Sequence, residues 1–110
     1  MRGEVWWADL NPVVGHEQAG RRPVLIVSSD IFNEGPTGLV VVVPVTSVRR
    51  GTPMHVVISP PEGGLTNVSY AMCEQIRTIS KDRLEKVSGS VGGGVMAAVE
   101  DRMKTLLDIP

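Results

Sequence analysis

The chain has 110 residues, of which 42% are hydrophobic and 21% are charged, and its formal net charge is −1. That length predicts one domain with a modest core, and the composition is ordinary for a globular protein. The near-neutral charge excludes a protein coated in positive charge, although a local basic patch is compatible with it. Eight of the eleven basic residues are Arg, whose planar guanidinium can donate two hydrogen bonds to one phosphate.

Cysteine use and hydrophobic patterning point to the cytoplasm. Cys73 is the single cysteine, so an intrachain disulfide is impossible, which fits a reducing compartment. The N-terminal segment 1–10 is charged and lacks the apolar stretch of a signal peptide, and no apolar run approaches membrane-spanning length. We therefore expect a cytoplasmic protein with no membrane partner.

Short apolar runs alternate with turn residues over most of the chain. Five or six strands are predicted, each rich in apolar or β-branched residues and bounded by Gly, Pro, Asn or Ser: 4–10, 22–29, 39–47, 54–59, 69–79 and 85–91. Pro44 lies inside the third run, which predicts an edge position or a bulge for that strand. The run 69–79 is expected to be one long strand, with a bend as an alternative.

Helical segments are short until the C-terminus. One turn is predicted within 30–38, with Ser29 or Asp30 as its cap, and a short helix over 80–84, with Ser80 as its cap.

The last segment is amphipathic. Val95, Val99, Met103 and Leu106 share one helical face. The sequence therefore predicts a mainly β (α+β) fold in a single domain, 1–110. It consists of a small barrel of five to seven short strands over about 1–91 and a C-terminal amphipathic helix over about 94–108.

The sequence gives little support for a metal site or for a catalytic nucleophile. His16, His55 and Cys73 do not occur in a CxxC, HxxxH or HExxH spacing, so neither a metal nor another cofactor is predicted. Cys73 lies in the middle of a predicted strand and is expected to be a buried core residue. No GxSxG motif is present.

A polar loop precedes the second strand. His16, Glu17 and Gln18 lie between glycines, and Arg22 begins the strand that follows. Consecutive strands are usually neighbours, and the start of one then lies beside the end of the next when the pair is antiparallel. Because Thr46 ends the next strand, the guanidinium of Arg22 and the hydroxyl of Thr46 are expected at the same rim.

RNA cleavage is a reaction that such a set could catalyse without metal, because RNA carries its own 2′-OH nucleophile. Arg22 would hold the phosphate oxygens, Thr46 an oxygen or the 2′-OH, and His16 could exchange protons near neutral pH. Plainer interpretations stay open: a solvated loop, a surface Arg pair and a hydroxyl that only caps its strand. Trp6 and Trp7 point to opposite faces, so one is expected in the core and the other could stack on a base.

The segments "RGEVWWADLNPVVGHEQAGRRPVLIVS", "VVVPVTS", "EQIRTI" and "RL" together resemble the MazF/PemK (Kid) toxin family over nearly the whole chain. The resemblance implies an SH3-like barrel with a C-terminal helix, assembled as a homodimer. It also implies a ribosome-independent, sequence-specific endoribonuclease that cuts single-stranded RNA and leaves 2′,3′-cyclic phosphate and 5′-OH ends. The implied partner is a cognate antitoxin, whose disordered acidic tail folds on binding and occludes the site.

The resemblance also assigns residues. The family's catalytic Arg and Thr fall on Arg22 and Thr46. The resemblance places His16, Glu17 and Gln18 in an RNA-contacting loop and Glu74 and Gln75 near the substrate groove. Arg21 and Ser47 are also predicted to bind RNA. His16 and Glu17 are also the candidates for the general base. The PemK/Kid branch has an Arg directly before the position of Cys73 and an Asp directly after it, where this chain has Met72 and Glu74, so the mechanism that uses Arg and Thr fits better.

Two alternatives belong to other function classes. A CcdB-like protein on the same fold would poison a topoisomerase by protein contact, without an Arg–Thr pair. An SH3-like module would bind RNA or protein without cleaving. An intact Arg22 and Thr46 favours the enzyme.

Overall fold

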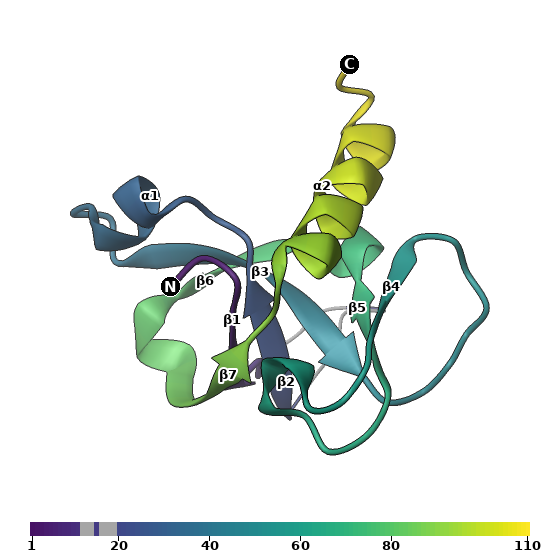
Figure 1. The fold of residues 1–110 in the computed structure, drawn as a ribbon. Coiled ribbons are helices and arrows are strands. Elements are labelled where there is room, and N and C mark those ends of the chain that lie inside the picture. Colours follow the sequence, from purple (N-terminus) through teal and green to yellow (C-terminus); the bar gives the residue numbers. More distant parts are fainter. Residues whose placement is uncertain (12–14, 16–19) are drawn as a thin grey trace.

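The computed structural model describes residues 1–11, 15 and 20–110. Within these residues the chain forms a small, strongly curved barrel with one long helix after it (Figure 1). The strands are β1 Glu4–Asp9, β2 Arg21–Ile26, β3 Leu39–Thr46, β4 His55–Ile58, β5 Ser69–Met72, β6 Arg77–Ser80 and β7 Leu84–Ser90. The helices are α1 Asp30–Glu34 and α2 Gly93–Leu107, and the 3-10 turns are η1 Glu62–Gly64, η2 Cys73–Gln75 and η3 Lys81–Arg83. The predicted fold class is confirmed, and no helix in the described ranges is long and apolar enough to span a bilayer.

β3 is the central strand of an antiparallel sheet. Along the sheet the order is β4-β5-β3-β2-β1-β7, and β6 also pairs with β3. On one edge β3 pairs with β2. On its other edge it pairs first with β6, through Leu39–Val42, and then with β5, through Val45–Thr46.

Strands β2 and β3 are buried on both faces, which explains their uninterrupted apolar sequences. Val24 and Ile26 of β2 pack into one cluster together with Val40 and Val42 of β3. The residues between and beyond them pack into a second cluster on the opposite face, among them Leu25, Val43, Val45, Ile58 and Val99. The sheet therefore has a core on each side, and α2 covers one of them.

Helix α2 lies within one residue of its predicted bounds. Val95, Val99 and Met103 of the predicted apolar face pack against the core, but Leu106 is 40% exposed. The last turn of α2 extends beyond the edge of the barrel (Figure 1), so Leu106 shares the predicted face of the helix but not its packing against the core.

The predicted long strand 69–79 is instead two strands joined by η2. The amide of Ile76 donates to the carbonyl of Cys73 at 3.3 Å, which closes a single tight turn. The turn directs β5 and β6 to successive parts of the same edge of β3. The prediction of one strand is wrong because the break has neither Gly nor Pro and depends on pairing with β3.

The prediction of an edge position at Pro44 is also wrong. Pro44 pairs with Val24 of β2 inside the sheet. On the opposite edge, pairing with β6 ends at Val42 and pairing with β5 begins at Val45. A residue that lacks an amide hydrogen therefore lies where β3 changes partners.

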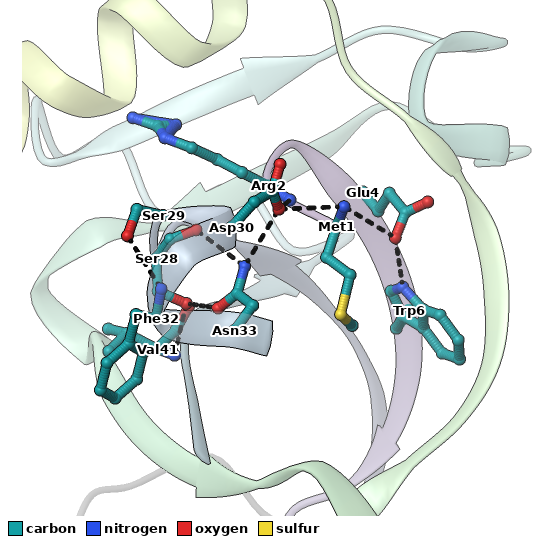
Figure 2. Close-up of polar contacts among 10 residues, drawn as sticks. All are labelled: Met1, Arg2, Glu4, Trp6, Ser28, Ser29, Asp30, Phe32, Asn33 and Val41. Carbon is teal, nitrogen blue, oxygen red and sulfur yellow. Dashed lines mark hydrogen bonds and ion pairs between the residues drawn. The ribbon is translucent and has the colours of Figure 1, made fainter. Parts of the chain in front are cut away.

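The N-terminus is held to α1 by polar contacts (Figure 2). One oxygen of Asp30 accepts from the backbone amide of Arg2 at 2.9 Å and lies 3.2 Å from the α-amine of Met1. Ser29 caps α1, as predicted, because its hydroxyl accepts from the amide of Phe32 at 3.3 Å. Asn33 is fully buried, and its side chain donates to the carbonyl of Ser28 at 2.9 Å.

The loop between β4 and β5 presses closely on β7. Gly64 has a φ of +68°, and a Cβ there would lie 1.9 Å from the carbonyl oxygen of Ser88. A Cβ on Gly89 would lie 2.6 Å from the amide nitrogen of Gly64. Only glycine fits at both positions, and this close approach fixes the loop in place.

Candidate active site

Arg22 and Thr46 meet at one rim of the barrel, as predicted. The antiparallel register pairs Val24 with Pro44, so the same register continued for two residues brings Arg22 opposite Thr46. Both side chains line one pocket of about 400 Å³. Arg22 is partly buried and Thr46 is only 5% exposed, so the strands rather than flexible loops position both groups.

The remaining walls come from β1, the first residues of β2 and the β4–β5 loop. The residues that line the pocket are Trp7, Arg21, Arg22, Pro23, Val45, Thr46, Ser47, Gly64, Leu65, Thr66, Asn67 and Ser69. The loop that contributes Gly64 through Asn67 is the one that packs against β7. The rigidity of this wall therefore depends on the contact between Gly64 and Ser88.

The tryptophans divide as predicted. Trp6 packs against the core cluster that contains Ala8 and Val24, and its indole nitrogen donates to Glu4 at 3.1 Å. Trp7 is 40% exposed and lines the pocket. The pocket lining thus combines one aromatic side chain with two Arg residues, a combination suited to a base and its phosphate.

The pocket is basic although the chain is nearly neutral. Its described lining contains Arg21 and Arg22 but neither Asp nor Glu. Nε of Arg21 donates to Glu85 at 2.8 Å, and this hydrogen bond with the Glu85 charge raises the pKa of Arg21 above its ordinary value. The ion pair holds one edge of the Arg21 guanidinium. Arg21 is exposed whereas Arg22 is partly buried, so Arg22 is the more buried cation of the two.

The hydroxyl of Thr46 has one backbone partner. Its oxygen accepts from the amide of Val48 at 3.2 Å, so Thr46 does cap the end of its strand. A hydroxyl also has a hydrogen to donate. Thr46 is therefore held in one orientation by its own backbone and can still donate to an anionic oxygen. Ser47 follows it and is exposed at the pocket rim.

The predicted loop residues His16, Glu17 and Gln18 lie outside the described residues. The base of their loop is described and is closed by hydrogen bonds. The amide of Leu10 donates to the carbonyl of Gly20 at 3.0 Å, and the amide of Gly20 donates to the side chain of Asn11 at 3.1 Å. Nη1 of Arg83 donates to the carbonyl of Asp9 at 3.2 Å and also to that of Asn11.

Glu74 and Gln75 lie in η2 and are not among the described residues that line this pocket. Glu74 lies 2.9 Å from Nε2 of His55. From the sequence, His55 was considered only as a metal ligand, and no ligand spacing supported that role. His55 is 8% exposed and lines a second pocket, beside the first. Only the pairing of β4 with β5 brings His55 near Glu74, so no local sequence signal identifies the pair.

Cys73 is a core residue, as predicted. It is fully buried, and burial, with a smaller contribution from the charge of Glu74, raises the pKa of its thiol to about 11. Because the thiolate is the reactive form, Cys73 is unsuited to nucleophilic catalysis near neutral pH.

Comparisons with known proteins agree on one family. The family model described as PemK-like, MazF-like toxin of type II toxin–antitoxin system matches residues 1–107. The chain is 38% identical to Endoribonuclease EndoA of Bacillus subtilis, over 96% of this chain and 92% of that protein. It is 37% identical to Endoribonuclease MazF9 of Mycobacterium tuberculosis, over 98% and 96% respectively.

Comparison with solved structures indicates the same family. MazF from Deinococcus radiodurans superposes with a TM-score of 0.86 at 30% identity, over 96% of this chain and 94% of that one. A mycobacterial endoribonuclease in complex with its cognate antitoxin superposes with a TM-score of 0.83 at 33% identity, over 100% and 96%. This protein belongs to the family of PemK-like, MazF-like toxins of type II toxin–antitoxin systems.

Proposed function

We propose that this protein is the toxin of a type II toxin–antitoxin system. It would cleave single-stranded RNA at a short sequence without metal or ribosome, leaving 2′,3′-cyclic phosphate and 5′-OH ends. The observation that carries the proposal is the convergence of Arg22 and Thr46 in one basic pocket with no acidic residue in its described lining. The related proteins named endoribonucleases add support.

The proposed reaction replaces one phosphorus–oxygen bond with another. The 2′-oxygen forms a bond to phosphorus while the bond from phosphorus to the 5′-oxygen breaks. One proton leaves the 2′-OH to a base, and one reaches the departing 5′-oxygen from an acid. Arg22 binds the nonbridging oxygens and stabilises their growing charge, and Thr46 donates to an oxygen of the same phosphate.

Proton transfer needs a group with a suitable pKa. The guanidinium of Arg is a poor base near neutral pH because it stays protonated there, so Arg22 is assigned to charge stabilisation. His16 and Glu17 remain the proposed bases, and Gln18 an RNA contact, on the strength of the sequence alone. If His16 is the base, His16→Ala loses one limb of the pH–rate profile, and an unchanged profile removes His16 from that role.

The proposed partners are a cognate antitoxin and a second copy of the chain, in the cytoplasm. Two relatives with matching folds were solved with their antitoxins, the mycobacterial endoribonuclease and MazE–MazF of Deinococcus radiodurans. Three large apolar residues are exposed in the last turn of α2 and just after it, Leu106, Leu107 and Ile109, an arrangement that a protein interface would cover. Sedimentation at micromolar concentration tests the dimer, and a monomer contradicts it.

The activity test uses a long single-stranded RNA in EDTA, with the ends of the products mapped. We expect cuts at one short sequence with cyclic-phosphate ends. Arg22→Ala should lose about 10²- to 10³-fold in rate, the usual effect of removing a group that stabilises transition-state charge. Arg2→Ala is the matched control, because Arg2 pairs with Glu100 of α2 and does not line the pocket.

A second pair of variants tests the hydroxyl. Thr46→Val preserves shape and removes the donor, whereas Thr46→Ser keeps it, so only Thr46→Val should lose most of the activity. Intact RNA from a preparation that still arrests growth would contradict the endoribonuclease and support the topoisomerase poison.

A further inference from the structure

The N-terminus of α2 has no capping side chain of its own. Gly92 is the N-cap residue, and Gly93 and Gly94 follow it, so none of the three offers a side-chain oxygen. A capping box has Glu or Gln at the next position to accept from the amide of the N-cap residue, but this chain has Val95 there. The first turn of α2 has no acidic residue, although negative charge is favourable at that end of a helix.

Glu62 supplies the missing carboxylate from the β4–β5 loop. The amide of Gly92 donates to Oε2 of Glu62 at 2.6 Å, a short hydrogen bond of the kind that a charged acceptor makes. The two residues are 30 positions apart in the chain, and Glu62 is partly buried. A contact that a capping box makes within one helix therefore joins two separate elements here.

The same loop forms a wall of the first pocket. Glu62 begins η1, and the wall follows it as Gly64 through Asn67. Two backbone hydrogen bonds close the turn between them. The amide of Gly64 donates to the carbonyl of Pro61 at 2.9 Å, and the amide of Leu65 donates to the carbonyl of Glu62 at 3.4 Å. A displacement of Glu62 is therefore passed to the first residues of the wall.

We propose that Glu62 is a positioning residue for the cleavage reaction. By accepting from the amide of Gly92, it fixes the β4–β5 loop to α2 and holds one wall of the pocket of Arg22 and Thr46 in place. Glu62 is the one charged residue in the loop 59–68, and it does not line the pocket, so it acts through the loop and not on the RNA. The close approach to β7 fixes the loop on one side, and the hydrogen bond to α2 fixes it at a second point. This inference rests on the proposed endoribonuclease activity.

The first variants change the two ends of the hydrogen bond. Glu62→Ala removes the acceptor, whereas Glu62→Gln keeps an oxygen that can accept from the same amide. Gly92→Pro removes the donor, and the φ of −83° at Gly92 is close to the value that proline imposes. Glu62→Ala and Gly92→Pro should each lower kcat/KM for RNA cleavage about ten-fold and raise KM, because a displaced wall misplaces the bound RNA. Glu62→Gln should retain most of the activity.

A further change separates positioning from stability. In the double variant Glu62→Ala, Gly94→Asp, the new carboxylate lies in the first turn of α2, where charge and the loss of a glycine both favour the helix. A Cβ on Gly94 has no atom within 4 Å among the described neighbours, so this change stabilises α2 without a link to the loop. Tm should return to the wild-type value while kcat/KM stays low.

The control is Glu100→Ala, which removes a different hydrogen bond of α2, the one from Arg2 at 2.8 Å, and should leave kcat/KM and KM unchanged. The inference is overturned if cleavage returns together with Tm in the double variant. It is also overturned if Glu62→Ala lowers kcat without changing KM, which is the result of a smaller folded fraction.

Hydrogen exchange tests the position of the loop without RNA. In Glu62→Ala, Gly94→Asp, with its Tm restored, the amides of Gly64 and Leu65 should exchange about five-fold faster than in the wild type, the net effect of one lost hydrogen bond. Unchanged exchange at these two amides overturns the inference whatever the activity. If the wild type cuts no RNA, the proposed function fails and the catalytic role of Glu62 fails with it. If the wild type cuts and Glu62→Ala cuts equally fast, the role of Glu62 alone is overturned.

Discussion

The contact between Gly64 and Ser88 makes a sharp prediction about stability and activity together. In Gly64→Ala, the new Cβ would lie 1.9 Å from the carbonyl oxygen of Ser88 and 2.5 Å from its carbonyl carbon. Both atoms belong to the backbone of β7, so no side-chain rotation can relieve the overlap. The β4–β5 loop must therefore move away from β7 or β7 must distort.

Gly38→Ala is the matched control. Gly38 has a φ of +70°, close to the +68° of Gly64, but a Cβ there has no atom within 4 Å among the described neighbours. A residue with a Cβ in left-handed backbone lowers the free energy of unfolding by about 1 kcal/mol. Forcing that Cβ into space that other atoms already fill lowers it by about 1–3 kcal/mol more. For a domain of about 100 residues, we expect Tm to fall by about 4 °C in Gly38→Ala and by about 12 °C in Gly64→Ala.

The assay has two parts. Thermal unfolding by circular dichroism gives Tm for both variants, and RNA cleavage is measured at a temperature at which both remain folded. Gly64→Ala should also lose cleavage activity, because Gly64 through Asn67 form a wall of the first pocket, whereas Gly38→Ala should retain it. Equal losses of Tm in the two variants would refute the reasoning, since they would show that the close approach relaxes without cost.

Three further predictions concern other parts of the fold. Val99→Ala should cost about 2 kcal/mol of unfolding free energy, because Val99 is 1% exposed in the core, and Ile31→Ala, where the side chain is 87% exposed, under about 0.5 kcal/mol; equal costs in urea unfolding would contradict the packing described for α2. The thiol of Cys73, with its pKa raised to about 11, should resist thiol reagents near neutral pH until denaturant exposes it, and rapid labelling of the native protein would count against this burial. The hydrogen bond from the amide of Arg2, and next the one from the α-amine of Met1, lower the pKa of Asp30 below its ordinary 3.8. The ionised Asp30 therefore stabilises the fold above pH 3.8, and this contribution is lost as the pH falls through the lower pKa of the folded state. The wild type should lose its stability advantage over Asp30→Asn on acidification, and a constant difference in urea unfolding would disprove the linkage.

Residues with strong local patterns were predictable, and contacts set by the tertiary fold were not. The runs in β2 and β3 read as buried strands because both of their faces are covered, and the expected pairing of these strands correctly brought Arg22 near Thr46. The turn at η2 was missed because it contains neither Gly nor Pro and exists only because β5 and β6 both pair with β3.

The second pocket was missed for a similar reason. His55 and Glu74 come from different elements, and their contact depends on the register that pairs His55 with Met72 in β4 and β5. An isolated His in a strand gives no sign of a partner nineteen residues away. By contrast, the division of Trp6 and Trp7 follows from strand alternation alone.

The pairing of β1 with β7 has a consequence for how the molecule folds. It joins Glu4 to Ser90, so the barrel closes only when nearly the whole chain is available, and closure over such a separation is entropically costly and slow. The β4–β5 loop, which forms one wall of the first pocket, presses against the same strand β7. The pocket is therefore assembled late, and a chain that stops before β7 contains Arg22 and Thr46 without the surface that completes their site.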